Sequence, residues 1–257
     1  VVRDLDVSLT EMRKVSDESL ESLKRYQDIS FDVAGSIGTT AKQIQASTAD
    51  YMRLGYNLNT SKELAKDANI YANVGDMDID TATEHMISSI QAWKSEFGNE
   101  IEASAAIIDR YNEIGNNFAI TSADIGSAME RSAAALKEGG NTLNEALGLI
   151  TAGNIIQQDA NTTSNALKIL SLRIRGAKAD LEDMGEETDG LVSSTSKMRG
   201  EIKALTGVDI MLNENTFKST AQIIQELGAI WQNLDDVSQA ATLEKIAGKN
   251  RASTVSG

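Results

Sequence analysis

The sequence predicts an all-α fold: a multi-helix bundle of helical hairpins preceded by an extended or coiled-coil N-terminal helix. The 257 residues contain no proline, the residue that most often interrupts helices and occupies turns. Several segments repeat hydrophobic residues at the spacing of one helix face, and no comparable run alternates as a β-strand does. Aromatic residues make up only 4% of the chain, so aliphatic and small side chains must form the core.

Residues 1–34 are predicted to form an N-terminal helical lead. Their apolar residues lie between charged neighbours, a pattern typical of an exposed or coiled-coil helix. These residues are Leu5, Leu9, Met12, Leu20 and Leu23. A helix of this kind needs a partner for its apolar stripe, and the sequence does not reveal that partner.

Residues 35–160 are predicted to form a helical-hairpin module. Apolar residues at i, i+4, i+7 and i+11 indicate two buried helix faces. The first consists of Met86, Ile90, Trp93 and Phe97, and the second of Ile107, Tyr111, Ile114 and Phe118. Residues 60–84 and 121–145 resemble each other faintly. True duplication and the general likeness of helical hairpins both explain this, and a regular solenoid is not established.

Residues 161–257 are predicted to form a long helix followed by a small helical module. A heptad-like run indicates the long helix, and a second helix face follows later in the segment. The run is Leu167, Leu170, Ile174, Ala177 and Leu181, and the later face is Ile223, Leu227, Ile230 and Leu234.

Capping signals divide the chain into roughly ten helices. Thr60 with Glu63 has the spacing of a capping box, and Thr121 with Asp124 has a weaker, acidic form of it. Glycines predict the helix ends, because a left-handed residue commonly terminates a helix. They are Gly75, Gly98, Gly139 with Gly140, Gly185 and Gly207.

The charge and the composition exclude several classes of protein. A formal net charge of −14 disfavours specific nucleic-acid binding, which requires clustered Lys and Arg, although a tube through which DNA slides would tolerate it. The absence of cysteine excludes disulfides and thiolate chemistry. No apolar run approaches the about 20 residues that span a bilayer. The chain begins with Val1 and shows no signal peptide, which indicates an excised or processed segment.

Two motifs that suggest metal binding do not satisfy its requirements. Asp76, Asp78 and Asp80 alternate like the start of an EF-hand loop, but the positions that require glycine and glutamate hold other residues, Thr81 and Ile87. We therefore predict an acidic turn between helices, with Asp80 as the N-cap. The single histidine, His85, cannot form the two-histidine zinc site of a metalloprotease. We predict that it lies at the surface or at an interface.

No catalytic, cofactor-binding or metal site is predicted, and we expect no enzyme activity and no cofactor. Ser194 and Lys197 have a Ser-x-x-Lys spacing, but the motifs that accompany it in penicillin-interacting enzymes are missing. The acidic pairs 182–183 and 186–187 surround Gly185 and are predicted to form a solvated turn.

One basic cluster and one apolar stretch remain to be explained. The cluster, Lys168, Arg173, Arg175 and Lys178, could contact a phosphate or an acidic partner, but a solvated face paired with Asp180 and Glu182 is the preferred interpretation. The stretch 143–156 places Gly148 and Ala152 at a small-x-x-x-small spacing. We predict a buried helix of a bundle, with membrane insertion after a conformational change as the alternative.

Several segments resemble the phage tail tape measure proteins of the TP901 type, over residues of about 35–257. They are 170–182 (LSLRIRGAKADLE), 205–210 (LTGVDI), 217–220 (FKST), 246–251 (IAGKNR), Leu227, Trp231, Leu234, 51–74 and 141–156. The resemblance implies a structural protein of a phage or prophage tail, which templates tube polymerisation, determines tail length and is expelled to open a route for DNA ejection. It implies a location in the tail lumen, and in the host cytoplasm during assembly.

The implied partners are the tail tube protein, the tail-tip or distal tail proteins, the assembly chaperones, further copies of the chain and the host envelope. One continuous helix of 257 residues would extend on the order of 385 Å. The predicted hairpins instead indicate a folded module, so we expect the measuring region elsewhere in the parent protein. The alternative function is a helical membrane-active protein, pore-forming or toxin-like.

Overall fold

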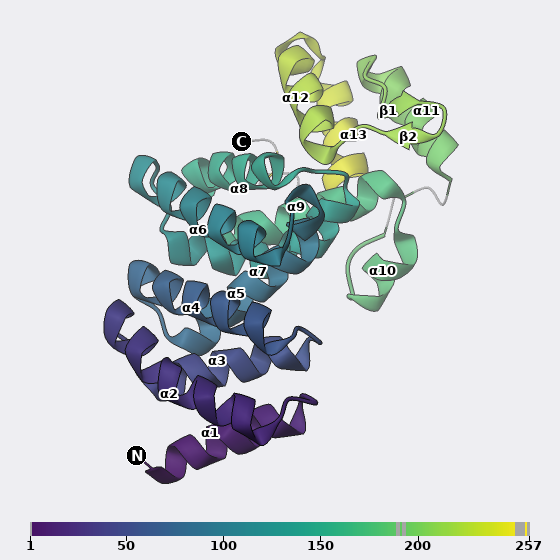
Figure 1. Cartoon of the computed structure of the whole chain (residues 1–257). Helices are drawn as coiled ribbons and strands as arrows, with labels where there is room; N and C mark the ends of the chain where they lie inside the picture. The colour runs from purple at the N-terminus through teal and green to yellow at the C-terminus, as the bar shows by residue number, and fades with distance from the viewer. Residues whose placement is uncertain (1, 189–190, 192–193, 250–254, 256–257) are drawn as a thin grey trace. The chain divides into compact units, whose positions relative to one another are not determined.

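A computed structural model describes residues 2–188, 191, 194–249 and 255, with side chains from residue 7 onward (Figure 1). Its described ranges hold thirteen α-helices and a single short pair of strands, which confirms the all-α prediction. The chain divides into two compact units. The first consists of Val1–Asn117 with Thr121–Gly126, and the second of Phe118–Ile120 with Ser127–Gly257.

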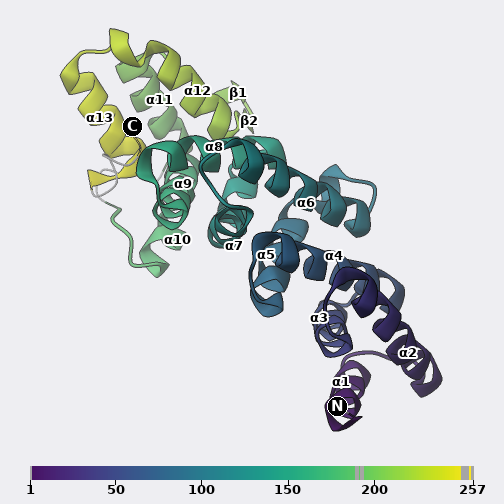
Figure 2. The same cartoon turned by 90° about the vertical axis from the view of Figure 1, so that its left-hand side faces the viewer.

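The first unit is a sequential array of helices. Its members are α1 (Val2–Lys14), α2 (Leu20–Ile37), α3 (Ala41–Arg53), α4 (Leu58–Gly75), α5 (Ile79–Trp93), the 3-10 turn η1 (Lys94–Glu96) and α6 (Glu100–Asn117). From α1 to α6, each helix contacts the next one and the one after it, and both Figures 1 and 2 show them side by side. The division between the units falls inside α7 (Ser122–Glu138).

The N-terminal lead differs from the predicted extended or coiled-coil helix. It folds into two helices, α1 and α2, joined by a turn, and both pack against α3. Leu9, Met12 and Leu23 are buried together with residues of α3, whereas Leu20 is exposed. The side chain of Leu5 lies outside the described residues. The apolar stripe of this segment therefore finds its partner within the chain.

The second unit contains the remaining elements. They are α8 (Leu143–Gln157), α9 (Ala160–Arg175), α10 (Lys178–Asp183), α11 (Thr195–Thr206), β1 (Met211–Asn213), β2 (Thr216–Phe217), α12 (Thr220–Ile230), the 3-10 turn η2 (Trp231–Asn233) and α13 (Asp236–Ala247). The strands form an antiparallel hairpin that the sequence did not predict, because two or three residues per strand are too few to show an alternating pattern. The hydrophobic core of the second unit joins α9 to α10, α11, α12 and α13.

Helices α2 to α9 each begin at a polar residue that caps the backbone. The caps are Ser19, Thr40, Asn57, Asp78, Asn99, Thr121, Thr142 and Asp159, so that they recur every 17 to 22 residues. The two faintly similar stretches at 60–84 and 121–145 belong to this repeated cap spacing.

Two of the predicted helix starts need correction. Asn57, rather than Thr60, caps α4, and its side-chain oxygen accepts a hydrogen bond from the Thr60 N–H. Asp78, rather than Asp80, caps α5. In both cases the true cap lies two or three residues earlier, because several polar residues stand side by side before each helix. The predicted pairing of Thr121 with Asp124 is confirmed.

The helices of the first unit carry hydrogen-bonded polar pairs inside their contacts. These pairs are Tyr26–Thr48 (2.6 Å), Gln45–Ser30 (2.7 Å), Asn69–Ser47 (3.0 Å) and Ser89–Tyr111 (2.5 Å). They join α2 to α3, α3 to α4 and α5 to α6. A buried polar group is costly unless it is hydrogen-bonded. Each pair therefore favours the one register of its two helices in which both partners meet, which apolar contacts alone would not specify.

Candidate functional site

Two of the three acidic residues that resembled a calcium loop, Asp76 and Asp78, act as helix caps. Asp78 accepts hydrogen bonds from the Thr81 N–H (2.9 Å) and the Thr81 hydroxyl (2.6 Å), and these bonds lower its pKa. Asp76 ends α4 in a left-handed conformation, with φ of 49°. Among the described residues, no cluster of three His, Asp or Glu side chains is placed to hold a metal ion.

His85 lies in the core of the first unit, which corrects the prediction of a surface or interface residue. Only 3% of it is exposed, and its Nδ1 lies 3.4 Å from the hydroxyl of Tyr71. That hydroxyl donates to the carbonyl of Ser122 (2.7 Å). A Cβ atom at Gly126 would overlap both the Tyr71 hydroxyl and the imidazole, so a side chain does not fit there. Burial lowers the pKa of His85 to about 4.

The basic cluster of α9 and α10 is only partly a solvated face. Lys178 pairs with Glu182 at 3.5 Å, as predicted. Gly185 follows α10 with φ of 70°, as the predicted turn requires. Arg173 and Arg175, however, point into the second unit, where both bind backbone carbonyl groups rather than solvent. These two arginines hold several backbone segments of this unit together.

Arg173 is completely buried and holds together three segments. Its Nε donates to the carbonyl of Lys245 (3.1 Å) and its Nη2 to that of Glu244 (3.1 Å). Its Nη1 donates to the carbonyl of Glu187 (2.7 Å), in the loop after α10. Glu244 and Lys245 lie in the last turn of α13, where the helix dipole is negative. The guanidinium therefore adds donors at the C-terminal end of α13, where the N–H of the capping residue, Gly248, also donates to the carbonyl of Glu244.

Arg175 fastens the loop after α7 to the strand that precedes α12. Its Nη2 donates to the carbonyls of Gly139 and Lys218, the latter at 2.9 Å. The centre of its guanidinium lies 4.2 Å from the centroid of the Phe217 ring. A planar cation is well suited to this position, because it can donate in its own plane and stack on an aromatic face at once.

The start of α12 is bonded to the start of α8. The Thr220 N–H donates to the carbonyl of Gly139 (3.0 Å), and the Ala221 N–H donates to the side chain of the buried Asn141 (2.9 Å). The Ser219 hydroxyl caps α12 and donates to Glu145 (2.8 Å), which itself belongs to the capping box of α8. We call Gly139, Asn141, Glu145, Arg173, Arg175, Ser219 and Thr220 the α9 hub.

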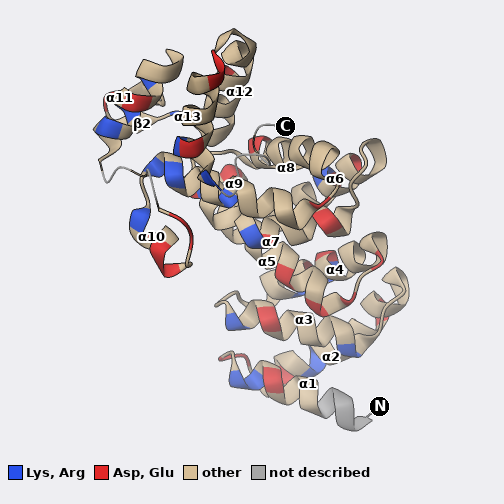
Figure 3. Cartoon of the chain, turned by 180° about the vertical axis from the view of Figure 1, so that it is seen from behind, with Lys and Arg blue, Asp and Glu red and all other residues tan. Residues whose placement is uncertain are grey.

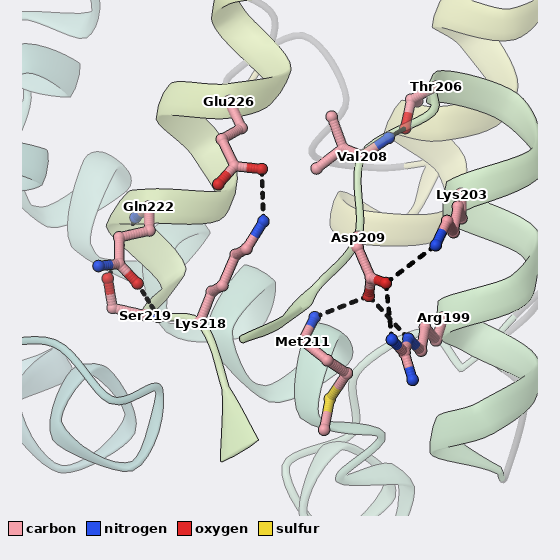
Figure 4. Close-up of polar contacts among 10 residues, drawn as sticks. All are labelled: Arg199, Lys203, Thr206, Val208, Asp209, Met211, Lys218, Ser219, Gln222 and Glu226. Atoms are coloured by element: carbon pink, nitrogen blue, oxygen red, sulfur yellow. Dashed lines mark hydrogen bonds and ion pairs between the residues drawn. The ribbon is translucent and has the colours of Figure 1, made fainter. Parts of the chain in front are cut away.

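A second set of polar contacts joins the β1–β2 hairpin to the helices before and after it, α11 and α12 (Figure 4). Asp209 accepts two hydrogen bonds from Arg199 (2.7 Å each), one from Lys203 (3.1 Å) and one from the Met211 N–H (3.0 Å). The paired Arg199 guanidinium holds the pKa of Asp209 well below its ordinary value. Lys218 pairs with Glu226 of α12 at 2.6 Å. These contacts fix the hairpin between α11 and α12.

Several of the segments that resemble the tape measure proteins meet at these two sites, whereas segment 51–74 belongs to the first unit. Segment 170–182 supplies both arginines, 205–210 supplies Asp209, and 217–220 supplies the ring under Arg175 and the cap of α12. Residues 250–251 lie outside the described residues. Sequence reasoning missed these roles, although Arg173 stands three residues after Leu170 and seven after Ala166, which places it on the buried stripe of α9.

The fold and the hub define a helical scaffold, in which arginine and capping side chains hold backbone segments together. The chain belongs to the family of phage-related minor tail proteins, whose family model matches residues 27–248. The prediction of a structural phage tail protein is confirmed at this level. No solved structure matches the chain.

Proposed function

We propose that this chain is a folded segment of a tape measure protein, which acts in tail assembly, docking and DNA delivery. The observation that carries the proposal is the family match, which covers residues 27–248 and so includes the α9 hub and most of the helical array. We also propose a non-catalytic role, which the match to the phage-related minor tail proteins supports. The residues of the resemblance that lie in the two polar sites hold the fold together, as an assembly module requires.

The folding back of the chain separates this role from the measurement of length. The longest helices have 18 residues, or about 27 Å each. In the first unit the helices pack side by side, so that the chain folds back repeatedly and does not extend along one helix axis. A measuring segment must lengthen in proportion to its residues. We therefore place the length-measuring region elsewhere in the parent protein.

The partners that suit this role are the tail tube protein, the tail-tip or distal tail proteins and the tail assembly chaperones. The module would act in the tail lumen after assembling in the host cytoplasm, and it would contact the host envelope during ejection. A net charge of −14 suits a neighbour of moving DNA, because an acidic surface repels phosphate.

The test is an in-frame deletion of residues 27–248 from the gene of a phage that encodes this chain, followed by electron microscopy of the tails. We expect loss of assembled tails, or tails of unchanged length that fail to deliver DNA. Tails that shorten in proportion to the residues removed would instead assign the measuring role to this segment. Absence of its peptides from purified virions, tested by mass spectrometry, would contradict any structural role in the tail.

A membrane-active function is the second candidate, and the observation that favours it is the apolar outer surface of α8. None of the described helices is both long enough and apolar enough to cross a membrane. If the purified chain causes dye to leak from vesicles, and substitution of exposed α8 residues by charged ones abolishes the leakage, this candidate would be supported.

A further inference from the structure

A hollow of about 490 Å³ lies in the first unit, where two turns of the chain meet. One turn joins α1 to α2 and the other joins α3 to α4, and they come together because α1 and α2 both pack against α3. Every lining residue belongs to the first unit, so one compact part of the chain forms the whole hollow. We call it the two-turn pocket and define it by Asp17, Glu18, Met52, Tyr56 and Leu58.

The two-turn pocket has an apolar floor and an aromatic wall. Met52 and Leu58 are buried and form the floor. The hydroxyl of Tyr56 accepts hydrogen bonds from Nε2 of Gln91 (3.0 Å) and Nζ of Lys94 (3.4 Å). The Lys94 ammonium also lies 5.5 Å from the centroid of the Tyr56 ring. These contacts hold the ring in place, so the wall is formed before any partner binds.

Two carboxylates line the pocket without a cation of their own chain. Neither Asp17 nor Glu18 forms an ion pair or a side-chain hydrogen bond with another described residue. The basic residues nearest to the pocket are instead paired with other carboxylates. These pairs are Lys14–Glu11 (2.6 Å), Arg53–Glu11 (3.3 Å) and Lys94–Glu100 (3.4 Å). Figure 3 shows the acidic turn that follows α1 next to the blue ends of α1 and α3.

The helix dipole explains the position of these carboxylates but not the pocket below them. Asp17 and Glu18 precede Ser19, the N-cap of α2, where the dipole favours negative charge. That interaction requires neither a hollow nor an apolar floor. Here a negative rim is combined with a floor of Met52 and Leu58, and a long side chain with a cationic tip matches both features.

We infer that the two-turn pocket binds a lysine or arginine side chain on a basic segment of another protein. The aliphatic stem of that side chain covers the apolar floor, and its charged group meets the carboxylates of Asp17 and Glu18. The charge of the first unit favours the same partner, because the unit contains 21 Asp and Glu residues against 11 Lys and Arg residues. This inference does not depend on the proposed tail function.

Other cations fit the pocket less well. No third His, Asp or Glu among the described residues completes a metal site with the two carboxylates. A free polyamine carries charges that lie several atoms apart, whereas Asp17 and Glu18 are adjacent in the chain and can meet on a single cationic group. One Lys or Arg side chain of a protein therefore matches the pocket best.

The first test measures the binding of a fluorescein-labelled peptide of alternating lysine and alanine to the full chain by fluorescence anisotropy. We expect saturable binding, which the double variant Asp17→Asn/Glu18→Gln weakens at least about fivefold. Asp28→Asn/Asp32→Asn is the matched control, because it removes the same charge from exposed positions of α2 outside the pocket. Circular dichroism establishes that all variants remain folded. Equal weakening in the two double variants, or no binding to the wild type, overturns the inference.

The second test examines the apolar floor with a second peptide, in which 2,4-diaminobutyric acid replaces lysine. This peptide keeps the positive charges but shortens each stem by two methylene groups, so it should bind the wild-type chain at least about threefold more weakly. Equal affinities of the two peptides would contradict a side chain laid on Met52 and Leu58. Spermidine that binds more tightly than the lysine peptide and displaces it would assign the pocket to a free polyamine and would also overturn the inference.

Discussion

Arg173 shows how a fully buried cation is accommodated inside the second unit. Three donors of its guanidinium meet three backbone carbonyls, and two of these belong to the negative end of a helix. Removing the side chain leaves the carbonyls of Glu187, Glu244 and Lys245 without this donor in a dry environment, and such a loss is far more costly than the loss of a surface ion pair.

We therefore expect Arg173→Met to lower the free energy of unfolding by about 3 kcal/mol, as measured by urea denaturation. Methionine keeps the apolar stem of the side chain and removes only the guanidinium. Arg199→Met is the control, because it breaks the partly exposed pair with Asp209 and should cost about 1 kcal/mol or less. Equal losses in the two variants would show that the buried carbonyls find other donors.

His85 makes the stability of the first unit depend on pH. Its pKa is about 4 in the folded chain against an ordinary value of 6.5, because burial disfavours the charged imidazole. Folding thus favours the neutral ring, so its contribution is complete above about pH 6.5 and is lost as the pH falls toward 4. The full shift corresponds to up to about 3 kcal/mol.

The measurement compares the wild type with His85→Gln, whose amide does not titrate. The wild type should lose more free energy of unfolding than the variant between about pH 7 and about pH 5. Taking the difference between the two chains cancels the titration of carboxylates such as Asp78, whose lowered pKa acts at more acidic pH. Parallel pH curves for the two chains would mean that His85 titrates as it does in water.

At the scale of the elements, the position of each cap decides where a helix begins. Asp78→Ala should lower the free energy of unfolding by about 1 kcal/mol, because the Thr81 N–H loses its acceptor. Asp80→Ala is the matched control. Asp80 lies in the first turn, where its carboxylate interacts with the helix dipole but does not cap the helix, so its loss should cost less than about 0.5 kcal/mol. Thermal unfolding followed by circular dichroism compares them, and a larger loss for Asp80→Ala would restore it as the cap.

The apolar periodicity predicted the elements well where a helix continues to its end. Met86, Ile90 and Trp93 are fully buried, as the spacing required. Phe118 belongs to the same kind of pattern, yet it is 50% exposed, because α6 ends at Asn117 and the periodicity no longer applies beyond it. Periodicity states which residues share a face only while the helix lasts.

The candidate site was much less predictable than the helices. Arg173 and Arg175 looked like half of a basic surface cluster, because their partners are carbonyls at positions 139, 187, 218, 244 and 245, far away in sequence. A backbone carbonyl carries no residue type that a motif search can detect. The two arginines could be recognised only by their place on an apolar stripe, and their roles required the tertiary structure.

At the scale of the whole molecule, the net charge of −14 opposes any contact between copies. Added salt screens this repulsion, because the Debye length falls from about 30 Å at 0.01 M to about 10 Å at 0.1 M. We therefore expect self-association of the wild-type chain to strengthen from low to high sodium chloride in sedimentation experiments. Dissociation at high salt would indicate a contact held by opposite charges instead.

The regular spacing of the caps from Ser19 to Asp159 bears on how such a chain can change its length during evolution. From α2 to α6 each helix has its own start signal, and its main contacts are with its near neighbours in sequence. A gene duplication or deletion of about 40 residues would therefore add or remove one hairpin and leave the remaining faces in phase. An insertion or deletion of a few residues inside a helix would instead turn the apolar face of the rest of that helix away from the helix it packs against. The array accepts changes in whole hairpins and resists changes in single residues.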